Sequence, residues 1–197
     1  MAEGFIPPHG GYRKLLSYQR AEIVYDATVR FCERHFHRRD RTIDQMVQAA
    51  RSGKQNIAEA SMASATSKET EIKLTNVARA SLGELLEDYR DFLRTHGLVE
   101  WEKSHPYAKR LSELLRTTDA TYETFKKAVE HDDPAISANA ILGLTKVAYA
   151  LLTKQIKQLE GAFVEEGGLR ERMTRARLDE RDRQREKLRR GDDELKS

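Results

Sequence analysis

An apolar stripe with the period of an α-helix runs through residues 42–63, and it limits the fold more than any other feature of the chain. Apolar side chains recur there at spacings of three and four residues: Ile43, Met46, Val47, Ala50, Ile57 and Ala60. Gly53 lies in the same stripe, although a glycine inside a helix costs about 1 kcal/mol relative to alanine. We therefore expect another helix to approach closely at Gly53. Thr42 and Gln45 have the spacing of a capping box, which predicts a helix start at Thr42.

Three further amphipathic segments predict long helices over about 12–36, 67–96 and 134–166. Thr66 and Glu69 have the spacing of a second capping box, which predicts that Thr66 caps the middle one of these segments. Its inward stripe is predicted to consist of Leu74, Val77, Ala78, Ser81, Leu85, Tyr89 and Phe92. These spacings indicate long helices, each of which must bury one side against the others.

The ends of these helices carry their own signals. Gly97 is expected to stop the third helix in the left-handed conformation. Asp133 followed by Pro134 is the favoured start of a helix, and Gly167 is expected to end the helix that begins there. The connection over residues 64–67 is short, so the helices on either side of it should be antiparallel neighbours.

The predicted fold class is therefore all-α: an antiparallel up-down four-helix bundle formed by residues 12–166. A flexible arm over residues 1–11 precedes the bundle, and a charged tail over residues 167–197 follows it. An insertion over residues 98–132 separates the third long helix from the fourth. This insertion is expected to contain two short helices, over residues 107–116 and 120–130.

Several motifs then resemble one family. Residues 54–60 (KQNIAEA), 67–69 (SKE) and 78–85 (ARASLGEL), with Gly97, resemble in order the landmarks of the four-helix-bundle proteins encoded in intervening sequences of 23S rRNA genes. The resemblance covers about residues 12–99. The structural signature it marks in this chain consists of Gly53, Asn56, Glu59, Ser81 and Gly83.

Further motifs resemble the longer subgroup of that family, which has a C-terminal suffix domain. They are residues 44–46 (DQM), 51–53 (RSG) and 167–173 (GGLRERM), together with Phe163. The resemblance implies self-association into a ring, with a pentamer as the expected form. It also implies similarity to the accessory protein of diversity-generating retroelements. Ala60 stands where the family usually has glycine.

The charge of the chain is concentrated in its tail. Of 35 Lys and Arg and 32 Asp and Glu, residues 167–197 hold 11 and 8, which leaves 24 of each sign in residues 1–166. The body is thus formally neutral, and the net charge of +3 belongs to the tail. The single Cys32 cannot form an internal disulfide, which favours a cytoplasmic location. Neither a signal peptide nor a membrane span is expected, so no membrane partner is predicted.

Three groups of cations are candidate nucleic-acid contacts. The basic connection after the first helix contains Arg38, Arg39 and Arg41, which either contact phosphate or complement the helix dipole at that end. The second group is expected to form a patch where the second and third helices meet, and consists of Arg51, Lys54, Lys68 and Lys73. The third lies at the start of the tail: Arg170, Arg172, Arg175 and Arg177. The tail itself is predicted to be either a marginal solvated helix or disordered.

The sequence contains no convincing catalytic constellation, and no cofactor or metal is predicted. His35 and His37 lack a third ligand at a suitable spacing, and Cys32 is interpreted as a small packing residue. Asn56 and Glu59 either form a polar site or fix the register of two helices through hydrogen bonds. Two functions stay open: a non-enzymatic nucleic-acid-binding assembly that contacts RNA or DNA, and a scaffold that binds a protein partner.

Overall fold

The computed structural model describes residues 10–117 and 119–194, and within these residues it is all-helical, with no strand. This confirms the predicted all-α class. Residues 1–9 of the predicted arm lie outside the described residues. The helices are η1 (Tyr12–Lys14), α1 (Leu16–His35), α2 (Arg41–Ala63), α3 (Lys68–Thr95), α4 (Pro106–Leu115), α5 (Tyr122–Val129), α6 (Pro134–Glu166) and α7 (Leu169–Glu194).

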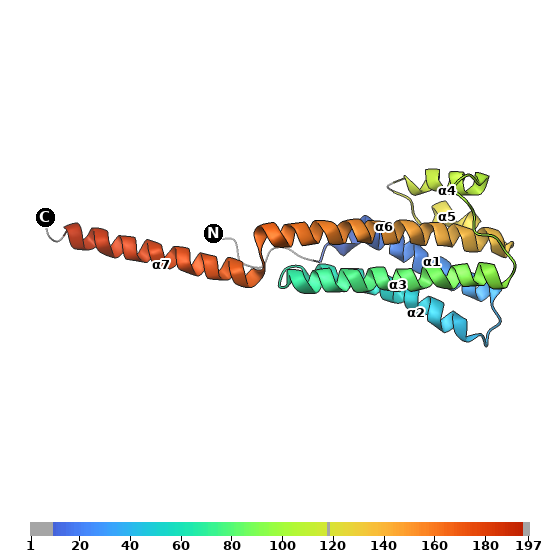
Figure 1. Cartoon of the computed structure of the whole chain (residues 1–197), viewed down its shortest axis with the longest axis horizontal. Helices are drawn as coiled ribbons and strands as arrows, with labels where there is room; N and C mark the ends of the chain where they lie inside the picture. Colours follow the sequence, from blue (N-terminus) through green and yellow to red (C-terminus); the bar gives the residue numbers. More distant parts are fainter. Residues whose placement is uncertain (1–9, 118, 195–197) are drawn as a thin grey trace.

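The four longest helices before the tail pack on one another. Helix α1 contacts α2 and α6, and α3 also contacts α2 and α6 (Figure 1). The apolar faces enclose one core, in which Tyr89 is fully buried and donates a hydrogen bond from its hydroxyl to Thr28 Oγ1 at 3.1 Å. A hydroxyl buried without a partner would cost about 1–3 kcal/mol, so this bond fixes α3 against α1 at little cost. Other fully buried core side chains are Phe31, Met46, Leu82, Leu85, Ile141 and Leu144.

The short helices α4 and α5 both pack against α6, and α5 also contacts α1. Leu111 of α4 is buried and lies over Gly143 of α6, where a Cβ atom would come within 2.5 Å of the leucine Cδ2. Arg20 of α1 is 1% exposed, and its guanidinium donates to the carbonyl oxygens of Thr117 and Ala120 at 2.5 and 2.9 Å. The residues between α4 and α5 are thereby attached to α1.

The structure corrects two predicted helix starts. Asp40 caps α2, because its carboxylate accepts a hydrogen bond from the Thr42 amide at 2.9 Å. Ser67 caps α3 by accepting from the Thr70 amide at 3.1 Å. The capping boxes predicted at Thr42 and Thr66 are thus wrong: in each case the chain turns into the helix one or two residues away, where another oxygen side chain reaches the free amides.

The predicted start of α6 and the predicted glycine ends of α3 and α6 are confirmed. Asp133 caps α6 with Pro134 at its first turn, and Gly97 and Gly167 have φ angles of +67° and +73°. The first predicted helix is interrupted, because Leu15 between η1 and α1 is extended. Val77, which was predicted to face inward, is 45% exposed.

Helices α2 and α3 approach closely at Gly53, as the interrupted stripe predicted. A Cβ atom at Gly53 would lie 2.6 Å from Cδ2 and 2.9 Å from Cγ of the buried Leu82. At the positions directly before these two residues, Ser52 and Ser81 share a hydrogen bond of 2.9 Å across the two helices. Gly83 faces α6 instead, where its Cβ would meet Tyr149 at an ordinary 3.5 Å.

The helical stretch from Pro134 to Leu188 contains a segment that is long and apolar enough, by length and composition alone, to cross a membrane. More than half of that segment is buried inside the protein, and the core helix of a soluble bundle has the same length and composition.

Candidate nucleic-acid interface

Helix α7 extends beyond the packed helices, in continuation of the end of α6 (Figure 1). Gly167 ends α6 in the left-handed region, and the Gly168 amide donates to the Glu171 carboxylate at 2.6 Å. This local hydrogen bond satisfies one of the free amides at the start of α7 and places a negative charge at the positive end of the helix dipole. The predicted tail is therefore a helix that presents its side chains to solvent.

The arginines of α7 are not evenly distributed around the helix. With 3.6 residues per turn, Arg170, Arg177 and Arg181 fall within about 40° of one another. Thr174 and Gln184 flank the three arginines, one on each side. We call these three arginines the arginine face of α7. The acidic residues between Leu169 and Leu188 all project at least about 60° away from each of these arginines, and they are Glu171, Asp179, Glu180, Asp182 and Glu186.

The remaining side of α7 has a mixed charge. Arg183 pairs with Glu180 at 3.9 Å, and Arg185 pairs with Asp182 at 3.7 Å. Arg172 and Arg175, two of the predicted contacts, point to this mixed side, whereas the other two, Arg170 and Arg177, belong to the arginine face. The four arginines are close together in the sequence, and only the geometry of the helix separates them onto two sides.

Arg170 lies near the start of α3. The hydrogen bond from Lys73 lowers the pKa of Glu69, and the positive charge of Arg170 adds to the same shift. Lys73 and Glu69 are both exposed and their side chains are 2.6 Å apart. The base of the arginine face therefore adjoins the bundle and is partly balanced by Glu69.

The four cations predicted to form a patch between the second and third helices do not come together. Lys54 lies over the ring of Tyr25 in α1, with Nζ 4.5 Å from the ring centre. Lys68 pairs with Glu71 at 3.0 Å. Since Gly53 contacts Leu82, Lys68 lies about 20 Å further along α3 than the level of Arg51 and Lys54. Of these four cations, only Arg51 is exposed and makes no ion pair with a described residue.

The groove beside the α2–α3 contact is polar and acidic. It has a volume of about 480 Å³, and Glu84 and Asp88 line it together with Gln48 and Ser52. Burial raises the pKa of Asp88, and the negative charges of Glu84 and Asp91 raise it further. An acidic groove repels phosphate, so this face of the protein does not suit a nucleic acid.

Arg38 and Arg39 lie in the connection from α1 to α2, Arg41 is the first residue of α2, and all three are exposed. Figure 1 places this connection at the end of the packed helices that is remote from α7. The predicted contacts at the α1–α2 connection and on α7 thus lie in separate regions, and only α7 aligns three arginines on one side.

Asn56 acts through Ser52. Its Nδ2 donates to the Ser52 carbonyl at 2.9 Å and to the Ser52 hydroxyl at 3.1 Å, and that hydroxyl is the one bonded to Ser81. Glu59 is exposed. The contact between the helices is therefore made by Ser52, which the sequence reasoning missed, although its spacing of four residues from Asn56 was a usable signal.

The residues considered for chemistry do not assemble into a reactive site. Burial raises the pKa of Cys32 to about 12, and the charges of Asp40, Asp88 and Glu33 contribute to that increase. Burial also lowers the pKa of His35, which packs against Phe31. Within residues 10–117 and 119–194, no group of three or more His, Cys, Asp or Glu side chains is placed to hold a metal ion.

Comparisons with known proteins add no identification: no protein-family model, no curated protein and no solved structure matches this chain.

Proposed function

We propose that this protein is a non-enzymatic helical-bundle protein that binds nucleic acid, with RNA as the preferred probe, through the arginine face of α7. The observation that supports this most directly is the alignment of Arg170, Arg177 and Arg181 on a side of α7 that none of the acidic residues between Leu169 and Leu188 shares. Guanidinium groups match phosphate geometry and stay charged at all physiological pH values. A projecting helix also reaches a large polyanion without steric conflict with the bundle.

The proposal extends to the arrangement of the subunit and its assembly. We infer that α1, α2, α3 and α6 form an antiparallel up-down four-helix bundle, and that subunits associate into a ring, with a pentamer as the expected form. The order of their mutual contacts and the short α2–α3 connection support the first inference. The resemblance to the 23S rRNA intervening-sequence family supports the second. A ring repeats the arginine face, so a weak contact gains avidity.

Contacts of this kind would give affinity without base selection. Arginine–phosphate contacts position a protein on the backbone, and their strength falls steeply with salt because bound counterions are released. Three phosphate contacts in one subunit contribute a slope of about −2 to −3 to the dependence of log K on log salt. The binding that we propose is therefore strongly dependent on ionic strength and weakly dependent on sequence.

A matched pair of variants tests the proposal. The first, Arg170→Gln/Arg177→Gln/Arg181→Gln, removes the arginine face. The second, Arg172→Gln/Arg175→Gln/Arg183→Gln, removes the same charge from the mixed side of α7. Filter binding of a structured RNA at two salt concentrations should show a large loss of affinity and a smaller salt slope for the first variant only. Equal losses in the two variants would mean that net charge matters and the face does not. No retention of RNA by the unmodified protein at low salt would refute the proposal.

The alternative function is an interaction scaffold whose tail binds a protein partner. Exposed apolar side chains near the α6–α7 junction favour it: Val164 is 83% exposed, and Met173 and Leu178 are 42% and 46% exposed. A pull-down with and without residues 167–197 distinguishes the two functions. Loss of a protein partner together with unchanged RNA binding would favour the scaffold.

A further inference from the structure

A second candidate site lies at the other end of the molecule, between α4, α6 and the connection that follows α3. These elements enclose a cavity of about 520 Å³, within the range of sites that bind small molecules. Its floor is apolar and includes the buried Leu111 and Leu142, with Gly143 between them. Figure 1 places α4 alongside the part of α6 remote from α7. The cavity is therefore separate from the arginine face and does not depend on the proposed function.

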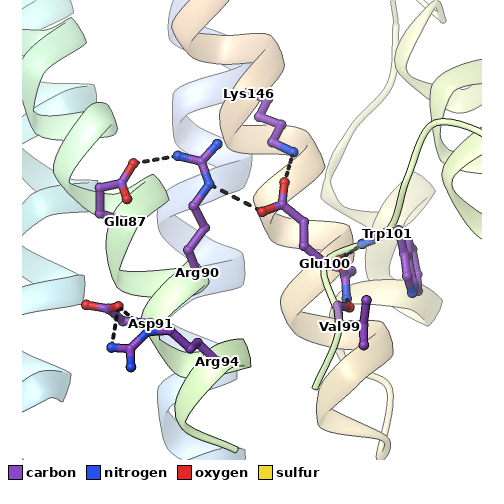
Figure 2. Close-up of polar contacts among 9 residues, drawn as sticks. Glu87, Arg90, Asp91, Arg94, Val99, Glu100, Trp101 and Lys146 are labelled. Atoms are coloured by element: carbon purple, nitrogen blue, oxygen red, sulfur yellow. Dashed lines mark hydrogen bonds and ion pairs between the residues drawn. The ribbon is translucent and has the colours of Figure 1, made fainter. Parts of the chain in front are cut away.

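Trp101 forms one wall of this cavity and is held there by its backbone. The side chain of Asn139, 4% exposed, accepts a hydrogen bond from the Trp101 amide at 2.8 Å and donates to the Val99 carbonyl at 3.0 Å. Between these two residues, the Glu100 carboxylate accepts from Arg90 of α3 at 3.3 Å and from Lys146 of α6 (Figure 2). The connection is thus fixed to both long helices.

The same ion pairs affect the ionisation of Glu100. Its partial burial opposes ionisation, but the hydrogen bonds and charges of Lys146 and Arg90 outweigh that effect and lower the pKa of Glu100. The carboxylate stays ionised through the physiological range. The position of Trp101 is therefore defined before any ligand arrives, which reduces the ordering cost of binding.

The Trp101 ring lines the cavity and has two aromatic neighbours, His105 and Tyr107, of which Tyr107 is tilted with its ring centre 5.5 Å away. The indole stacks on His105 with ring centres 4.8 Å apart and an angle of 6° between the planes. His105 lines a neighbouring hollow and does not line this cavity, whereas Trp101 lines both. Trp101 is therefore shared by the two hollows, and its side chain forms part of the cavity wall. An indole in a cavity wall can accept a planar aromatic ring by stacking.

The rim of the cavity is positively charged. Lys103, Lys109 and Arg116 line it, and none of them makes an ion pair with a residue that the structure describes. The only acidic residue lining it, Glu113, pairs with Arg110 at 3.3 Å. Positive charge above an apolar floor favours a ligand that has both an anionic group and an apolar or aromatic body.

We propose that this cavity binds a free nucleoside monophosphate, with the base stacked on Trp101 and the phosphate held by Lys109 and Arg116. Lys109 lies on α4 and Arg116 directly follows that helix, two turns further along or about 10 Å, and Lys103 is close to Trp101 in the sequence. A planar ring and a phosphate separated by a sugar can contact both parts of such a site. A compact inorganic anion would leave the aromatic wall and the apolar floor uncovered.

Intrinsic fluorescence tests the assignment directly, because Trp101 is the single tryptophan of the chain. Titration of the full-length protein with adenosine 5′-monophosphate should quench the tryptophan emission saturably. The variant Lys109→Gln/Arg116→Gln should weaken the affinity on the order of tenfold or more, since two charge-assisted contacts are lost. The control Lys154→Gln/Lys157→Gln removes the same charge from exposed positions of α6 that do not line the cavity, and its affinity should be unchanged.

Three results would overturn the proposal. The first is no saturable quenching by adenosine 5′-monophosphate at millimolar concentration, and the second is equal weakening of the affinity in the two double variants. The third is quenching by a single-stranded oligonucleotide without quenching by the mononucleotide. Adenosine, which has the ring without the phosphate, should bind more weakly than the monophosphate. The arginine-face variant Arg170→Gln/Arg177→Gln/Arg181→Gln should bind the monophosphate normally, so failure of this site and failure of RNA binding by α7 are distinguishable.

Discussion

At the scale of single residues, two glycines that both lie inside helices have different roles. Both Gly53 and Gly83 lie inside helices, where alanine is favoured by about 1 kcal/mol. A Cβ at Gly53 would press on Leu82 at 2.6 Å, and Leu82 is fully buried and has little room to move. A Cβ at Gly83 would make an ordinary contact with Tyr149 at 3.5 Å. Only the first glycine is therefore required by packing.

The two alanine variants should consequently have opposite effects. Gly83→Ala should raise the free energy of unfolding by about 0.5–1 kcal/mol through helix propensity. Gly53→Ala should be less stable than Gly83→Ala by about 1–3 kcal/mol, because overpacking between α2 and α3 offsets the gain in propensity. Urea denaturation of the two variants measures the difference. Equal stabilisation of both would show that α2 and α3 separate at Gly53 without cost.

Cys32 provides a second prediction at this scale. A pKa near 12 leaves only about one thiol in ten thousand ionised at pH 8, and the side chain is 1% exposed. Reaction of the native protein with Ellman's reagent should be at least about 100-fold slower than reaction of the protein unfolded in urea. The native rate should keep rising with pH up to pH 9, since the raised pKa lies above that range. A fast native reaction with a midpoint near pH 8.5 would contradict the burial of the thiol.

At the scale of elements, the sequence predicted the helices well and their mutual contacts poorly. Period and end signals located α2, α3 and α6 within a few residues, because the apolar stripe and Asp133-Pro134 are local features. Which cations come together depends on the partner that each helix face meets. Lys54 stacks on Tyr25, a residue 29 positions earlier, and no local pattern indicates this contact. The cavity at Trp101 was missed for the same reason, since α4, α6 and the connection that follows α3 each supply part of it.

Helix α7 should have a lower free energy of local unfolding than the packed helices. Its stability rests on exposed ion pairs worth a few tenths of a kcal/mol each, whereas ten residues of α3 are buried. In a hydrogen-exchange experiment, backbone amides of residues 173–188 should exchange within seconds. Amides near Leu82 and Tyr89 should be protected by several orders of magnitude, close to the global unfolding free energy. Comparable protection in both regions would show that another surface covers α7.

Arg20 joins elements that are distant in sequence, and it was not among the predicted functional residues. It has no carboxylate partner in the described residues and instead satisfies two carbonyl groups between α4 and α5. Arg20→Met should lower the free energy of unfolding by about 1–3 kcal/mol and make the α4–α5 connection more susceptible to proteolysis, because both carbonyls lose their donors. Arg39→Met, at an exposed position between α1 and α2, is the control and should leave both measurements unchanged. Equal effects of the two substitutions would contradict the linking role of Arg20.

At the scale of the whole molecule, the proposed function depends on repetition of a modest charge. The chain carries a net charge of only +3, and a single α7 offers three aligned arginines. One such helix binds a polyanion weakly at physiological salt, since each exposed contact is screened. Several copies fixed in one assembly act at a high effective concentration. The oligomeric state is thus the property on which the nucleic-acid proposal depends most.

The mass of the protein in solution decides this point. The chain has a mass of 22.6 kDa, so a pentamer has five times that value, about 113 kDa. Multi-angle light scattering should give the larger mass at micromolar concentration; elution volume alone is unsuitable because the projecting α7 enlarges the apparent size. The arginine-face variant should keep the same mass, which separates assembly from RNA binding. A mass of 22.6 kDa would remove the avidity argument, since three arginines on one helix would then have to hold RNA alone, and affinity should be lost at moderate salt.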